Sequence, residues 1–296
     1  MIEWAWLVLR AAGFALLLQA AGAVLFLTAF GSRLTRSAPA IRRVAARAAA
    51  AALAVCVAQY FLEAAHMAGE WSGSADASLL RLVWTSSAGQ AFALRIAALA
   101  CVGLGVARDA AALRALAFAG SLAALSSFLV TGHTAVHPGR VILAPLLFVH
   151  LLLIAFWFGS LWPLRQLATL ESRSDAARAI DAFSAAAVWL VPVIPLAGAA
   201  LATLLLPGFG SLWEPYGRLL GVKLGLFALL MILAALNKRR FVPALARGET
   251  QALPRFRRSV AMEYALICAT LAVSAALTGL YSPAGAHGHA GVTARA

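Results

Sequence analysis

Histidine is the side chain best suited to metal chemistry in this sequence, and its distribution is uneven. Three of the six histidines, His133, His137 and His150, lie within one apolar stretch that contains TGHTAVHPGR. Imidazole binds both Cu(II) and Cu(I), and His66 is followed by Met67, whose thioether also suits Cu(I). These side chains predict a metal-handling surface.

Other candidate ligands lie near the C-terminus and within apolar runs. His287 and His289 are separated by one glycine, and together with His137 they are accessory metal-ligand candidates. The three cysteines stand alone without a C-x-x-C spacing, which argues against a disulfide framework or a thiolate cluster. They are Cys56, Cys101 and Cys268.

The elements that must position these side chains are predicted to be membrane-spanning helices. The chain has 296 residues, of which 63% are hydrophobic and 12% charged, and its mean hydropathy is +0.88. A helix needs about 20 apolar residues to cross the hydrocarbon core, and eight such runs occur, which predicts an all-α helical bundle. The runs are 5–30, 48–67, 91–107, 113–131, 141–164, 183–206, 219–236 and 260–281, of which the third and fourth should form a tight hairpin.

The basic residues predict the orientation of this bundle. Seventeen of the 24 lysines and arginines follow the odd-numbered runs, so the positive-inside rule places both termini in the periplasm. The net charge of +13 is then charge beside lipid headgroups at the cytoplasmic face, and it does not indicate nucleic-acid binding. We predict one membrane domain over residues 1–283 and a flexible periplasmic tail over 284–296.

Charged residues inside the runs predict a structural cluster. Glu63, Arg95 and Lys223 fall one to two turns from the outer ends of the second, third and seventh runs. Unpaired charges are costly at that depth, so we expect the three side chains to neutralise one another and to hold three helices together. Glu263 lies near the inner end of the last run, close in depth to the basic residues 238–240, and is expected to be an anchor.

The same topology predicts where the metal ligands meet. His66 and Met67 end the second run, His133 follows the fourth, and His150 enters the fifth from the same face. The short connection between the fourth and fifth runs favours antiparallel neighbours. We therefore predict one copper site formed by these four side chains, with Trp157 closing it from beneath.

Some functional classes are not supported by any motif. The chain has no Ser-His-Asp grouping, no Walker loop and no zincin H-E-x-x-H motif. We therefore expect neither a hydrolase nor an ATP-driven pump, and no enzyme activity. A b-type haem redox protein is an alternative, because paired histidines on facing helices can bind haem iron.

Several ordered segments suggest a family. TGHTAVHPGR is followed by HLLLIAFWFGSLWPL, and then by EPYGRLLGVK and RFRRSVAMEY. With AAHMAG earlier in the chain, these segments resemble the copper resistance protein D (CopD) family over about residues 53–283. Two positions depart from the family pattern: Ser160 replaces a glycine in W-x-G-G-L, and Lys238 stands where arginine is common.

The resemblance implies a multi-pass protein of the bacterial inner membrane that handles copper. Such proteins are linked to copper uptake or tolerance and are often paired with a small periplasmic copper-binding partner of the CopC type. We therefore expect movement of copper ions from the periplasm toward the cytoplasm, with the lipid bilayer and such a partner as the interaction surfaces. A copper-delivery or assembly factor that does not transport is a further alternative.

Overall fold

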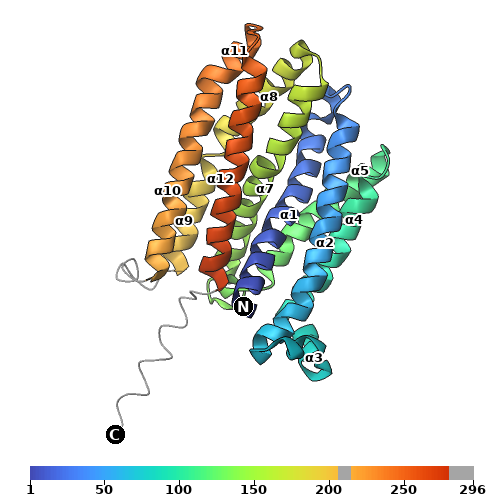
Figure 1. Ribbon diagram of the computed structural model, residues 1–296, viewed down its shortest axis with the longest axis vertical. Coiled ribbons are helices and arrows are strands. Elements are labelled where there is room, and N and C mark those ends of the chain that lie inside the picture. Colours follow the sequence, from blue (N-terminus) through green and yellow to red (C-terminus); the bar gives the residue numbers. More distant parts are fainter. Residues whose placement is uncertain (206–214, 280–296) are drawn as a thin grey trace.

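The computed structural model describes residues 1–205 and 215–279, and every regular element in this part of the chain is a helix. Eight helical segments are long and apolar enough to cross a membrane, which confirms the predicted all-α bundle (Figure 1). The long helices are α1 (Ile2–Phe30), α2 (Ala38–Ala68), α4 (Ser87–Gly105), α5 (Ala111–Ser126), α7 (Arg140–Leu170), α8 (Arg173–Leu190), α9 (Val193–Leu205), α10 (Pro215–Leu236) and α12 (Ala252–Gly279).

Shorter elements connect these helices at the two ends of the bundle. The α-helical ones are α3 (Ala77–Thr85), α6 (His133–Val136) and α11 (Val242–Ala246). Three 3₁₀ segments, Gly31–Arg33, Trp71–Ala75 and Ser127–Leu129, and one π-helical segment, Asn237–Phe241, complete the described elements.

Polar caps decide where several of these helices begin. The side chain of Asp76 accepts from the amides of Ser78 and Leu79 at the start of α3, at 2.8 and 3.2 Å. The hydroxyls of Ser86 and Ser172 accept amide hydrogens in the same way at the starts of α4 and α8. These caps satisfy amides that have no partner within the helix.

The predicted hairpin of the third and fourth spans is present as α4 and α5. At Gly105, an added Cβ would lie 2.5 Å from the amide nitrogen of Ala117, and at Gly120 it would lie 2.8 Å from the carbonyl oxygen of Ala98. Small residues therefore let the two backbones approach closely, as is common between membrane helices.

The sixth predicted span differs from the single helix expected. It is divided into α8 and α9 by a turn at Val191–Pro192. Proline has no amide hydrogen to donate and its ring clashes with the preceding turn, and Pro192 is followed closely by Pro195. A break inside a membrane frees backbone groups that other partners must satisfy. The second half of the divided span, α9, packs against α7.

The two ends of the bundle differ in composition. The start of α1 and the last turn of α12 lie at one end of the bundle, where Arg10 donates to the Thr278 hydroxyl at 3.3 Å (Figure 1). We call this the terminal end. The opposite end, which we call the basic end, holds the α1–α2, α4–α5, α7–α8 and α10–α12 connections, and with them most of the lysines and arginines. That the basic end faces the cytoplasm remains a prediction.

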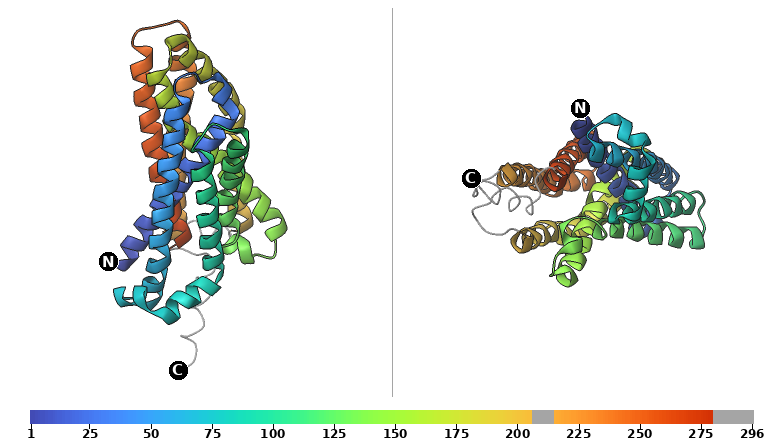
Figure 2. Two further views of the ribbon diagram at one scale, coloured as in Figure 1. Left: turned by 90° about the vertical axis from the view of Figure 1, so that its right-hand side faces the viewer. Right: turned by 90° about the horizontal axis from the view of Figure 1, so that it is seen from below.

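Helices α1 and α7 cross in backbone contact near the middle of the bundle. An added Cβ on Gly22 would lie 1.8 Å from the carbonyl oxygen of Ala155, and one on Gly159 would lie 2.4 Å from the Cα of Gly22. Gln19 donates to the Gly159 carbonyl at 3.1 Å beside this contact. Seen from below, α4 and α5 lie on one side of the bundle and α9 and α10 on the other (Figure 2), so the crossing joins two groups of helices.

A carboxylate closes the basic end. Glu171, which follows α7, accepts five hydrogen bonds from the backbone and hydroxyl groups of Thr35 and Ser37 and from the amide of Arg36, at 2.5–3.1 Å. Burial alone would raise the pKa of Glu171, but the hydrogen bonds outweigh it and lower this pKa to about 2. One side chain thus holds the α1–α2 connection against the end of α7.

Replacing Gly22 with alanine should destabilise the bundle by about 3 kcal/mol or more, because the new methyl group overlaps backbone atoms that cannot rotate away. Gly103→Ala is the matched control, since an added Cβ at Gly103 meets nothing within 4 Å. Unfolding of both variants in detergent, followed by circular dichroism, checks this prediction. Equal stability of the two variants would contradict the close crossing.

Glu171→Gln should destabilise the protein by about 2 kcal/mol at pH 7, as expected for lost hydrogen bonds to a charged group. A carboxyl group whose pKa is lowered in the folded state stabilises the fold at pH values above its ordinary pKa of 4.5. This stabilisation is lost as the pH falls toward about 2. The difference in unfolding midpoint between wild type and Glu171→Gln should therefore narrow between pH 4.5 and 2. Glu249→Gln, at an exposed residue of the same end, is the control. A stability difference for Glu171→Gln that did not change with pH would argue against the role of Glu171 in holding the α1–α2 connection to α7.

Candidate functional site

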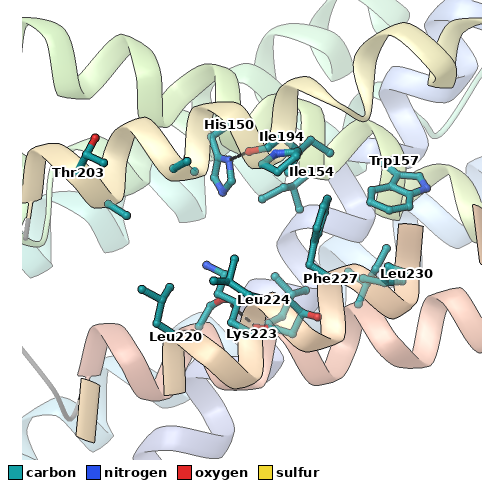
Figure 3. A pocket seen from close by; sticks show the side chains of 18 residues that line it. His150, Ile154, Trp157, Ile194, Thr203, Leu220, Lys223, Leu224, Phe227 and Leu230 are labelled. Carbon is teal, nitrogen blue, oxygen red and sulfur yellow. Dashed lines mark hydrogen bonds between the residues drawn. The ribbon is translucent and has the colours of Figure 1, made fainter. Parts of the chain in front are cut away.

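A cavity of about 440 Å³ lies between α7, α9, α10 and α12 (Figure 3). Its walls are mostly apolar, with Ile154, Leu224 and Phe227 among them. Its polar side chains are few: His150, Thr203, Lys223, Thr270 and Ser274. We call it the histidine cavity. A largely apolar cavity with a few polar groups is the usual form of a binding site.

The orientation of the His150 ring is set by the neighbouring broken span. Nδ1 of His150 lies 3.0 Å from the carbonyl oxygen of Ile194 in α9. A carbonyl oxygen only accepts, so Nδ1 carries the hydrogen, and Nε2 of the neutral ring is left with a free lone pair. A hydrogen bond of this kind is what fixes the tautomer of a metal-binding histidine.

Glycine makes room for this ring. An added Cβ on Gly198, one turn beyond Ile194, would lie 3.1 Å from Cε1 of His150. That distance is tighter than ordinary contact, so any larger residue at this position would displace the imidazole. The glycine itself is visible in the sequence, but only the packing of α9 on α7 shows that Gly198 is the one that borders the His150 ring.

Lys223 shares the cavity with His150. It projects from α10, on the wall opposite α7, toward the side of the cavity where His150 lies (Figure 3). Among the described residues, no carboxylate lies within 4.0 Å of its ammonium group. An imidazole ligand and a cationic side chain therefore lie in one apolar chamber.

A second cavity, also of about 440 Å³, lies nearer the basic end, between α7, α8, α10 and α12. We call it the glutamate cavity, because Glu263 of α12 lines it with only 3% of its surface exposed. Asn237 donates to the Glu263 carboxylate, while its own Oδ1 is buried without a hydrogen-bond partner among residues 1–205 and 215–279. Sequence reasoning expected an anchor at Glu263, and the structure shows a buried carboxylate there that is held by Asn237.

Trp157 separates the two cavities. It lines both of them, and its ring packs edge-on against Phe227 with centroids 6.3 Å apart. Along α10, residues 220–230 line the histidine cavity and residues 231–239 line the glutamate cavity. The two chambers are thus stacked along the helix axes with an aromatic partition between them.

His66 and Met67 lie elsewhere, at the terminal end of α2. Nε2 of His66 is 3.1 Å from a carboxylate oxygen of Glu3, and its ring stacks on Trp6 with centroids 4.8 Å apart. Met67 is 51% exposed. Neither residue lines the histidine cavity. The structure therefore does not assemble His66 and Met67 with His150 into one site.

The remaining histidines are placed only in part. His133 begins α6 at the terminal end, and its side chain is outside the described part of the chain. Nδ1 of His137 accepts from the amide of Gly139 at 2.9 Å. His287, His289 and the predicted tail 284–296 lie outside the described residues. Within residues 1–205 and 215–279, no group of three or more His, Cys, Asp or Glu side chains could hold a metal ion.

The predicted charge cluster is divided between two places. Glu63 and Arg95 line a cavity of about 400 Å³ in the N-terminal group of helices, which we call the arginine cavity. Lys223 lines the histidine cavity instead. The predicted depth of these residues does not determine which helices are neighbours, and α10 packs mainly on α12. The cation that accompanies Glu63 and Arg95 is Arg10 of α1, which sequence reasoning did not single out.

Comparison with known proteins agrees with the two groups of helices that the α1–α7 crossing joins. Residues 1–143 match the family model "Copper resistance protein D-like, N-terminal domain", and residues 177–277 match "Copper resistance protein D". The chain is also similar to "Inner membrane protein YebZ" of Escherichia coli (strain K12), with 31% identity over 136 residues.

That similarity covers 45% of this chain and 47% of YebZ, so the chain spans about half the length of this curated relative. No solved structure matches the chain. The two family models cover the helices on both sides of the α1–α7 crossing, and the bundle has eight candidate spans. The chain therefore belongs to the copper resistance protein D family and is a multi-pass protein of the inner membrane.

Proposed function

We propose that this protein carries copper ions across the inner membrane, from the periplasm toward the cytoplasm, and that His150 binds the ion in transit. The observation that supports this most directly is the hydrogen bond from Nδ1 of His150 to Ile194, which leaves Nε2 free inside the histidine cavity. Membership of a copper resistance family names the metal, and imidazole is a suitable ligand for both of its common oxidation states.

A single imidazole favours passage over storage. The hydroxyls of Thr270 and Ser274 already donate to backbone carbonyls within α12, at 2.9 and 2.8 Å. No thiolate or thioether is among the lining residues of the histidine cavity. Conduction requires binding that is strong enough for entry and weak enough for release, and one nitrogen ligand meets that requirement better than a closed set of four.

Lys223 would further weaken copper binding at His150. An ammonium group in the same apolar chamber repels a second cation, and this repulsion is screened less than it would be in water. The residue would therefore shorten the time that an ion spends on Nε2. In this proposal, His150 and Lys223 set the affinity of the transit site by opposing effects.

The glutamate cavity supports a direction of movement along the helices. An ion that leaves His150 toward the basic end meets Trp157 and then the buried carboxylate of Glu263. The Glu263 side chain offers oxygen ligands to a cation, and the Oδ1 of Asn237, which has no hydrogen-bond partner among the described residues, is a further oxygen beside it. If the basic end faces the cytoplasm, this order runs inward.

Entry would occur at the terminal end. Met67 is half-exposed there, next to His66, and α6 with His133 and His137 lies at the same end. We propose this region as the place where a periplasmic copper-binding protein of the CopC type delivers its ion. His287 and His289 would be accessory ligands. The proposed role is transport, with no catalytic reaction.

The alternatives receive less support. A b-type haem needs two imidazoles on facing helices, whereas His150 is the single imidazole among the described side chains that line the histidine cavity. A copper-delivery or assembly factor would not require two cavities stacked along the membrane-spanning helices. The experiments below distinguish these roles, because only a transporter moves copper into sealed vesicles.

His150→Asn tests the transit site without removing the structural hydrogen bond. The asparagine Nδ2 can occupy the place of Nδ1 and still donate to Ile194, but nothing replaces Nε2. Copper uptake into oriented proteoliposomes should fall roughly tenfold or more, equivalent to about 1.4 kcal/mol of lost binding, while the unfolding midpoint stays close to that of wild type. Val149→Ala, at the neighbouring position of α7, is the control, because Val149 is exposed and lines none of the three cavities. Unchanged uptake by His150→Asn would refute the assignment.

Lys223→Leu should strengthen copper binding roughly tenfold, because a like charge near the ion is removed. Lys223→Arg retains the charge and should leave the affinity near that of wild type. Both affinities can be measured in detergent with a competing copper chelator. Weaker binding by Lys223→Leu would mean that Lys223 assists the ion, for example by holding an anion that travels with it, and would contradict the opposing roles proposed here.

A further inference from the structure

The arginine cavity carries an excess of positive charge that the copper proposal does not use. Arg10 of α1 and Arg95 of α4 line it, and Glu63 of α2 is the carboxylate among its lining residues. Within the described part of the chain, no carboxylate lies within 4.0 Å of either arginine. Two guanidinium groups and one carboxylate leave one uncompensated positive charge among apolar helices.

The hydrogen-bonding capacity of these arginines is only partly used. Arg10 donates to Thr278 at 3.3 Å, and its Nε is buried without a partner in the described part of the chain. Arg95 donates through Nε to the hydroxyl of Ser127 at 3.0 Å. The Glu63 carboxylate is engaged instead by the indole of Trp6, at 2.7 Å. Each guanidinium group has five N–H donors, so most of them have no acceptor among the residues that the structure describes.

Aromatic rings hold both guanidinium groups in place. The Arg10 guanidinium carbon lies 5.0 Å from the centroid of Trp6 and 5.5 Å from that of Phe14. The Arg95 guanidinium carbon lies 4.8 Å from the centroid of Phe128. Cation–π contacts stabilise the charges without neutralising them. The cavity therefore presents fixed donors beside flat apolar walls.

From this arrangement we propose that the arginine cavity binds a small organic carboxylate. The carboxylate group would lie between Arg10 and Arg95, because the guanidinium fork matches its two oxygens. The apolar part of the molecule would pack on the rings of Phe14 and Phe128. A volume of about 400 Å³ is large for a single inorganic anion and suits a small aromatic acid.

The cavity's position gives such a molecule an entrance. Its lining includes Ser87 at the start of α4, Thr131 and Gly132 after α5, and Gly279 at the end of α12. All of these lie at helix ends on the terminal side of the bundle, so the cavity extends to the aqueous boundary there. A guanidinium group has no lone pair to give a metal ion, whereas the imidazole of His150 has one, and this difference separates the arginine cavity from the transit site.

Titration of the purified full-length protein in detergent with benzoate, followed by isothermal calorimetry at low ionic strength, tests the proposal. Benzamide is the neutral control of the same shape. Benzoate should bind, and benzamide should bind at least tenfold more weakly. Arg10→Gln and Arg95→Gln should each weaken benzoate binding tenfold or more. Glu63→Gln should strengthen it, because a repelling charge is removed.

Arg81→Gln is the matched control, since Arg81 is an exposed arginine of α3 at the same end of the bundle. The melting temperature of each variant shows whether it is folded. If Arg95→Gln does not fold, Arg95→Lys keeps the charge but loses the fork and should still bind benzoate several-fold more weakly. Equal binding of benzoate and benzamide, or of benzoate by wild type and both glutamine variants, would overturn the proposal. The proposal would also be overturned if the protein bound chloride but did not bind benzoate.

Discussion

The contact between Gly22 of α1 and Gly159 of α7 is the constraint on which the rest of the bundle depends. In lipid, the hydrophobic effect does not drive helices together, and close van der Waals packing must do so instead. Side chains larger than hydrogen at these two positions would overlap backbone atoms. The crossing holds the arginine cavity on one side and the histidine and glutamate cavities on the other, so a defect there would disturb all three.

A second constraint is that polar backbone groups at membrane depth must find partners. The ring of His150 is a polar group at this depth, and its Nδ1 donates to the carbonyl of Ile194 in the first turn of α9, just after the division of the sixth span. The same hydrogen bond fixes the tautomer of the imidazole. The hydrogen bond that the imidazole needs at membrane depth and the chemistry proposed for His150 therefore depend on one contact.

The hydropathy of the sequence predicted the eight spans, because length and apolar content alone identify a membrane helix. It also singled out His150, an ionisable residue within a span. It did not predict the neighbours of that residue. Position along a span gives depth, but the side toward which a side chain points depends on how helices rotate and pack. Lys223 was therefore assigned to the wrong partners, and His66 was grouped with His150 although it packs on Trp6. The glutamate cavity was missed for the same reason, since Asn237 and Glu263 are 26 residues apart and meet only in the folded bundle.

The position of Trp157 has a consequence for the proton gradient across the membrane. A continuous column of water through the bundle would let protons flow down their gradient, at a dissipation of about 2.3 kcal/mol per charge for each 100 mV of membrane potential. Trp157 and Phe227 interrupt any such column where the two chambers meet. In the proposed transport role, an indole wall at this point would let each chamber offer a polar binding group from its own side while the membrane stays electrically sealed.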